Sequence, residues 1–124
     1  MFYDRGESEL ALVNYDRAVA LRAEYPEAWS NRGVALNALG RTREALESFE
    51  QSLRVAPNHA VAYANRGNLF KDEKRMEEAL ADYDLALALR PRLAEAHYNR
   101  ATVLLDLKRT DEWSALSKVV HVQS

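Results

Sequence analysis

The chain has 124 residues, of which 48% are hydrophobic and 29% are charged, and its formal net charge at pH 7 is −2. This composition is typical of a folded globular protein, and the charge gives no basic surface for nucleic acid. The chain has no cysteine, which excludes disulfides and thiolate metal sites, and no apolar run approaches the roughly 20 residues of a membrane span. We therefore expect neither nucleic acid nor a membrane as a partner, and we take the cytoplasm as the default compartment.

Helix-forming residues dominate, and apolar side chains recur at helical spacing along the chain. Short breaks separate the helical segments, for example Gly40-Arg41 and Pro57-Asn58-His59. Connections this short make consecutive helices antiparallel neighbours, and no strand pattern competes. The predicted fold class is all-α, with about seven helices near residues 8–22, 27–39, 42–55, 60–73, 76–89, 94–107 and 110–121.

The chain repeats itself at an offset of 34 residues. Residues 26–59 and 60–93 are identical at ten of 34 aligned positions, and Pro57 recurs as Pro91. A fixed period of this length indicates stacked units that bury their apolar faces only against their neighbours. We expect one domain over residues 1–124, divided into a partial repeat (1–25), two repeats (26–59 and 60–93), and a degenerate repeat or C-terminal capping helix (94–124).

Small and bulky side chains recur in step with this period. Gly33, Gly67 and Ala101 share one position, and Tyr15, Phe49 and Tyr83 share another. Glycine inside a helix costs about 1 kcal/mol relative to alanine. Its recurrence therefore predicts that a side chain at this position would clash with a neighbouring helix.

These positions resemble the tetratricopeptide repeat, a helix–turn–helix unit of 34 residues. The family's aromatic, glycine and bulky positions, and its small–aromatic–small triplet with a closing proline, match two complete units: Trp29, Gly33, Leu36, Ala45, Phe49, Ser52 and Pro57, then Tyr63, Gly67, Phe70, Ala79, Tyr83, Ala86 and Pro91. The resemblance implies an α-α superhelix, here with an incomplete first repeat and an atypical last helix. One departure is that arginine stands at 32, 66 and 100, where the family usually has leucine.

Periodicity fails at both ends of the chain. At the start, Phe2-Tyr3 would be the tail of a first helix whose remainder is missing. At the other end, Trp113 falls at the position of Ala45 and Ala79, so we expect the last helix to rotate and bury Trp113, Leu116 and Val120 as a cap. The alternative is a fraying tail over residues 119–122. Exposed terminal faces would also favour a homo-oligomer, because uncapped terminal repeats present apolar surface.

The resemblance implies that the first helix of each pair lines a concave groove. One asparagine per repeat, at 31, 65 and 99, would form a ladder there, and an amide can both donate to and accept from a peptide backbone. The predicted peptide-binding residues are Ser30, Asn31, Asn65, Asn68, Lys71, Tyr98, Asn99 and Thr102. The ladder resembles that of O-linked N-acetylglucosamine transferases; alternatively, the asparagines only bridge neighbouring helices. The groove has no convergent Lys/Arg set for the two-carboxylate clamp of chaperone-binding members.

The three arginines have acidic residues 16 positions earlier. This offset predicts the ion pairs Asp16–Arg32, Glu50–Arg66 and Asp84–Arg100 between consecutive repeats. A partly buried pair of this kind would set the stacking register more than it adds stability. The alternative is an arginine row that binds phosphate or acidic peptides.

No catalytic, cofactor or metal-binding pattern stands out. The three histidines are scattered, and the chain has no P-loop, dinucleotide fingerprint or nucleophile elbow. We predict a non-catalytic module that binds an extended peptide or partner protein in the groove, without a cofactor. The alternatives are a self-associating scaffold that uses its terminal helices, and a substrate-recruiting fragment of a larger enzyme such as a glycosyltransferase.

Overall fold

The computed structural model describes residues 5–123, and the side chains of these residues up to 118. The described part contains six helices and no strand: α1 (Arg5–Leu21), α2 (Pro26–Ala38), α3 (Thr42–Val55), α4 (Ala60–Asp72), α5 (Met76–Leu89) and α6 (Ala94–Gln123). The all-α fold class is confirmed. The expected tail of an earlier helix at Phe2-Tyr3 lies outside the described residues.

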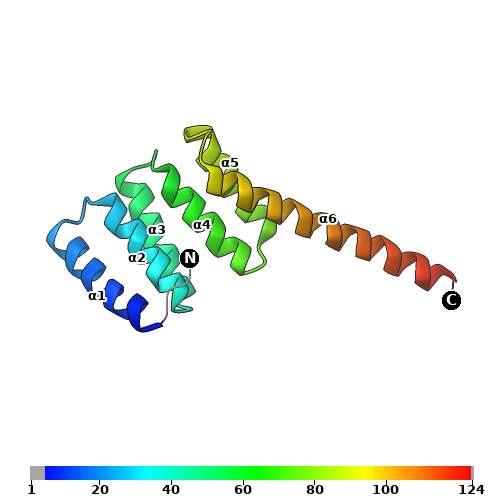
Figure 1. Cartoon of the computed structure of the whole chain (residues 1–124), viewed down its shortest axis with the longest axis horizontal. Helices are drawn as coiled ribbons and strands as arrows, with labels where there is room; N and C mark the ends of the chain where they lie inside the picture. Colours follow the sequence, from blue (N-terminus) through cyan, green and yellow to red (C-terminus); the bar gives the residue numbers. More distant parts are fainter. Residues whose placement is uncertain (1–4, 124) are drawn as a thin grey trace.

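The helices stack as pairs along one direction (Figure 1). α2 packs against α3 and α4 packs against α5, while α1 and α6 flank these two pairs. α2 also contacts α4, and α4 contacts α6, so the first helices of successive repeats lie side by side. This arrangement gives the stack an inner layer made of α2, α4 and the first half of α6.

The recurring glycines allow the two helices of a pair to pack closely. A Cβ atom added at Gly33 would lie 2.5 Å from Cε1 of Phe49, and one at Gly67 would lie 2.8 Å from Cε1 of Tyr83. Both aromatic rings are buried. The predicted clash is therefore confirmed, and the partner of each glycine is the aromatic residue 16 positions later.

The turn within each complete repeat has the same construction. Gly40 and Lys74, 34 residues apart, both have positive φ, at 76° and 63°. The N–H of the following arginine donates to a carbonyl five residues earlier, Arg41 to Leu36 and Arg75 to Phe70, as in a Schellman motif. This turn reverses the chain between α2 and α3 and again between α4 and α5.

The prediction of seven helices is wrong at the C-terminal end, where residues 94–107 and 110–121 belong to the single helix α6. Lys108 occupies the turn position of Gly40 and Lys74, yet the helix continues through it. Residues 106–112 contain neither glycine nor proline. Ion pairs between Arg109 and Asp106 and between Lys108 and Glu112 span this segment at helical spacing.

The expected burial of the last helix against the stack is also wrong. Trp113 is 70% exposed and Leu116 is 60% exposed, whereas Ala45 and Ala79, at the position equivalent to Trp113, are fully buried. An indole does not fit where the earlier repeats bury a methyl group against the paired helix. The second half of α6 therefore projects away from the other helices (Figure 1), and the side chain of Val120 lies outside the described set.

Candidate functional site

An open groove of about 840 Å³ crosses the inner layer of the stack. Its walls come from three helices, because α2, α4 and α6 bury one face against their partners and leave the opposite face open. The lining residues are Asn31, Val34, Asn37, Ala38, Val61, Asn65, Asn68, Asp72, Ala94, Glu95, Tyr98 and Asn99. On α4 they follow the spacing i, i+4, i+7, i+11, which is one face of a helix.

Five of the eight residues predicted from the sequence line this groove: Asn31, Asn65, Asn68, Tyr98 and Asn99. Ser30 does not match the expectation, because it is only 1% exposed and accepts a hydrogen bond from Asn65 beneath the groove surface. Lys71 and Thr102 are also outside the lining. The Thr102 hydroxyl donates to the backbone carbonyl of Tyr98 on its own helix.

Two of the ladder asparagines connect neighbouring helices. Asn65 Nδ2 donates to Ser30 Oγ at 3.1 Å, and Asn99 Nδ2 donates to Asn68 Oδ1 at 3.0 Å. Asn99 Oδ1 accepts from Lys71 Nζ at 3.2 Å. The bridging interpretation therefore holds for these contacts, and it explains why Lys71 is turned toward Asn99.

The asparagines still have polar groups to offer. Asn31 is exposed and makes no side-chain hydrogen bond within residues 5–123. Asn65 uses one N–H, which leaves a second N–H and the carbonyl oxygen free for another partner. The groove therefore presents amide donors and acceptors although part of the ladder also bridges repeats.

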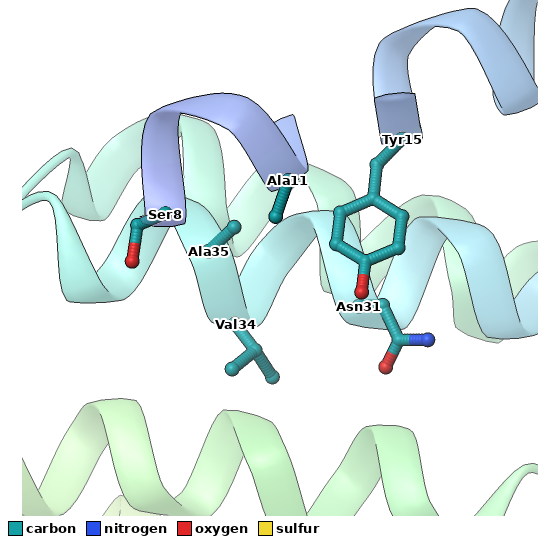
Figure 2. A pocket seen from close by; sticks show the side chains of 6 residues that line it. All are labelled: Ser8, Ala11, Tyr15, Asn31, Val34 and Ala35. Carbon is teal, nitrogen blue, oxygen red and sulfur yellow. The ribbon is translucent and has the colours of Figure 1, made fainter. Parts of the chain in front are cut away.

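A smaller pocket of about 50 Å³ adjoins the groove between α1 and α2. It is lined by Ser8, Ala11, Tyr15, Asn31, Val34 and Ala35. In Figure 2 the Tyr15 side chain reaches from α1 toward the end of the pocket at which Asn31 lies. The pocket would admit a small side chain next to the first rung of the ladder.

Sequence reasoning missed Asp72, which it assigned to a solvated helix end. Asp72 lines the groove and accepts a hydrogen bond from Asn37 Nδ2 at 3.2 Å. It lies seven residues after Asn65, so its position on the same helix face was a usable signal. The groove also includes Ala38 and Ala94, whose small side chains carry no sequence signal of their own.

The arginine row is paired with carboxylates, and two of the three predicted pairs are confirmed. Arg32 Nε lies 2.6 Å from Asp16, and Arg100 Nε lies 2.7 Å from Asp84. Arg66 differs, because its guanidinium donates two hydrogen bonds of 2.8 Å to Asp82, on the second helix of its own repeat. The predicted Glu50–Arg66 pair is wrong.

The sequence explains why Arg66 turns to Asp82. The position of Asp82 holds Ser48 in the preceding repeat, and Arg32 donates to that hydroxyl as well as to Asp16. An ionised carboxylate is a stronger acceptor than a hydroxyl, and its geometry suits a bidentate guanidinium. The Asp82 hydrogen bond raises the pKa of Arg66, to which Glu50 adds only a weaker electrostatic attraction.

Two further classes of site were searched in the described residues. They contain no group of three or more His, Asp or Glu side chains that could hold a metal ion. None of the described helices is long and apolar enough to cross a membrane.

Two family profiles match the chain. One described as "TPR repeat" matches residues 1–40 and 67–108, and one described as "Tetratricopeptide repeat" matches residues 26–59. A search of curated proteins found no match. The finer likeness of the asparagine ladder to that of O-linked N-acetylglucosamine transferases stays a prediction.

Solved structures with the same fold include several TPR domains. The first TPR of Spaghetti (RPAP3), bound to the HSP90 peptide SRMEEVD, is 23% identical with a TM-score of 0.76, over 83% of this chain and 82% of that one. The Arabidopsis OM64 TPR domain is 23% identical with a TM-score of 0.73, over 79% and 81%. YrrB, described as a TPR protein with an unusual peptide-binding site, is 30% identical with a TM-score of 0.72, over 77% of this chain and 50% of that one.

Proposed function

The chain belongs to the tetratricopeptide-repeat family, and from this premise we propose that it is a non-catalytic interaction module that binds an extended peptide of a partner protein. The proposed site is the groove formed by α2, α4 and α6. The observation that carries the proposal is an open groove of about 840 Å³ whose lining includes asparagine amides from all three helices. A surface of this kind binds well but offers no nucleophile or acid–base pair.

The spacing of the helices suits an extended peptide. Packed helix axes lie about 8–10 Å apart, and an extended chain advances about 3.3 Å per residue, so one repeat corresponds to about three peptide residues. Amides at Asn31 and Asn65 would bond the peptide backbone, and each bond would contribute about 1 kcal/mol net. Val34 and Val61 would give apolar contacts between these polar positions.

Two of the related structures support peptide binding as the general mode. Spaghetti (RPAP3) was solved with a bound HSP90 peptide, and YrrB is described by its peptide-binding site. The fold is shared with these proteins, while the groove residues of this chain decide its own partner. The finer interpretation, a substrate-recruiting part of a larger enzyme, would use the same groove.

Substitution of Asn31 tests the proposal with little risk to the fold, because this side chain makes no hydrogen bond within the described residues. Peptides selected from a random library on the wild-type chain should bind Asn31→Ala about fivefold more weakly, as expected for one lost hydrogen bond. Isothermal titration calorimetry would measure the change. Asn58→Ala, an exposed asparagine in the turn before α4, is the matched control and should bind as wild type. Equal affinity of Asn31→Ala and wild type would contradict the proposal.

Self-association is a second candidate function. The observation that favours it is the exposed apolar side of α6, where Leu105, Trp113 and Leu116 are 54%, 70% and 60% exposed. Their spacing of i, i+8 and i+11 places them within about 80° around the helix axis. A stripe of this kind on a projecting helix would pack against the same stripe of a second copy.

A further inference from the structure

The charges of the groove are all of one sign. Among the described residues that line it, only Asp72 and Glu95 are charged, and both are exposed carboxylates. Asp72 accepts from the neutral amide of Asn37, and Glu95 has no ion pair within residues 5–118. The nearby cations are already engaged: Lys71 bonds Asn99, and Arg32, Arg66 and Arg100 bond carboxylates outside the lining. The groove therefore favours a cationic ligand.

An exposed aromatic ring strengthens this preference at one end of the groove. Tyr98 is 74% exposed and lies three residues after Glu95, so both side chains share one face of α6. The equivalent positions of the earlier repeats hold Ser30 and Ala64, so the ring occurs only in the third unit. A Lys or Arg side chain can lie over the ring while its charge faces Glu95.

The two carboxylates lie at opposite ends of the groove. Asp72 ends α4, while Glu95 lies in the first turn of α6, at the position that Val61 holds on α4. Val61 and Asp72 are 11 residues apart, which is about 16 Å along the axis, and the next helix adds a lateral offset of about 8–10 Å. The straight-line separation is about 19 Å, which an extended peptide spans in five to six residues at about 3.3 Å each.

We infer that the groove selects an extended peptide with two basic side chains about five to six positions apart, one beside Asp72 and one between Glu95 and Tyr98, and that it disfavours acidic peptide ends. This inference rests on the proposed peptide-binding function and names the chemistry of the partner. The neutral stretch between the two basic residues lies against the asparagines, which bond its backbone.

Three synthetic peptides of equal length test the inference by fluorescence anisotropy. All share a neutral core and differ only at two positions five residues apart, which hold arginine, glutamine or glutamate. The wild-type chain should bind the arginine peptide about tenfold more tightly than the glutamine peptide, and the glutamate peptide most weakly, as expected for two exposed ion pairs. The preference for arginine should shrink as salt is raised.

Isosteric variants assign the preference to the two carboxylates. Asp72→Asn and Glu95→Gln should each weaken the arginine peptide about threefold and leave the glutamine peptide unchanged. Glu47→Gln, at an exposed position of α3 outside the groove, is the matched control and should change neither affinity. Arginine and glutamine peptides that bind equally well, and both more weakly to Asn31→Ala, would overturn the charge preference and leave the peptide groove intact. Failure of all three peptides to bind at millimolar concentration would overturn both.

Discussion

At the scale of single residues, burial decides which of the charged pairs matter. The Arg66–Asp82 pair is largely buried, with side-chain exposures of 22% and 4%, whereas the Arg100–Asp84 pair is 39% and 59% exposed. The guanidinium of Arg66 also lies 5.7 Å from the ring centroid of Tyr63. Each arginine is thus held between helices, which favours a structural role for the row over a phosphate-binding one.

Removal of the buried carboxylate should therefore be costly. Asp82→Ala is expected to lower the free energy of unfolding by about 2–3 kcal/mol, because it leaves a half-buried guanidinium without its partner. Asp84→Ala is the matched control and should cost less than about 1 kcal/mol, since its pair is exposed. Urea denaturation of both variants would give the two values.

A double-mutant cycle separates the true partner of Arg66 from the one predicted by spacing. Arg66→Leu combined with Asp82→Ala should show a coupling energy above about 1 kcal/mol, and the same arginine variant combined with Glu50→Ala should show almost none. A larger coupling to Glu50 than to Asp82 would refute the geometry described above.

At the scale of elements, the turn inside each repeat depends on one residue with positive φ. Gly40 adopts this conformation without cost, whereas Lys74 adopts it with a side chain. The α4–α5 turn is therefore strained compared with the α2–α3 turn, although both make the same backbone hydrogen bonds.

Exchange of the two turn residues should have opposite effects. Lys74→Gly is expected to raise the free energy of unfolding by about 0.5–1 kcal/mol, since it relieves the left-handed conformation, and Gly40→Lys should lower it by a similar amount. Chemical denaturation monitored by circular dichroism would measure both. The prediction fails if Lys74→Gly is as destabilising as Gly40→Lys.

At the scale of the whole molecule, the projecting half of α6 sets this chain apart from a closed stack. Trp113 and Leu116 lie on it, exposed and away from the groove (Figure 1). A monomer leaves this apolar stripe in water, and association of two copies along α6 would bury it. The groove and the stripe are on different parts of the molecule, so peptide binding and self-association can be tested separately.

Replacement of Trp113 tests the association. If copies associate through α6, Trp113→Glu should shift the molecule toward monomer in sedimentation velocity at high concentration, because a charge would be buried in the interface. Ser114→Glu, the next and also exposed position, adds the same charge beside the stripe and is the control. A wild-type chain that is already monomeric at millimolar concentration would exclude self-association through this face.

Most of the fold could be predicted from the sequence, because prolines, glycines and apolar spacing act locally. The bounds predicted for two helices, 42–55 and 76–89, agree with α3 and α5, and the remaining predicted ends of α1, α2 and α4 differ by one to three residues. The last repeat was not predictable in this way. Its turn position has a lysine, as in the α4–α5 turn, and whether the chain turns there depends on whether the next helix finds a place to pack.

The sequence by itself determined the 34-residue period, the pairing of Gly33 and Gly67 with large aromatic partners, and the face on which the asparagines lie, because each of these follows from spacing along one helix. Only the tertiary structure decided the rest. It gave Arg66 to Asp82 instead of Glu50, buried Ser30 under Asn65, and brought Asp72 and Glu95 to the two ends of one groove. These outcomes depend on which side chains meet across helices, where distance, burial and competing partners decide among contacts that sequence spacing leaves equal.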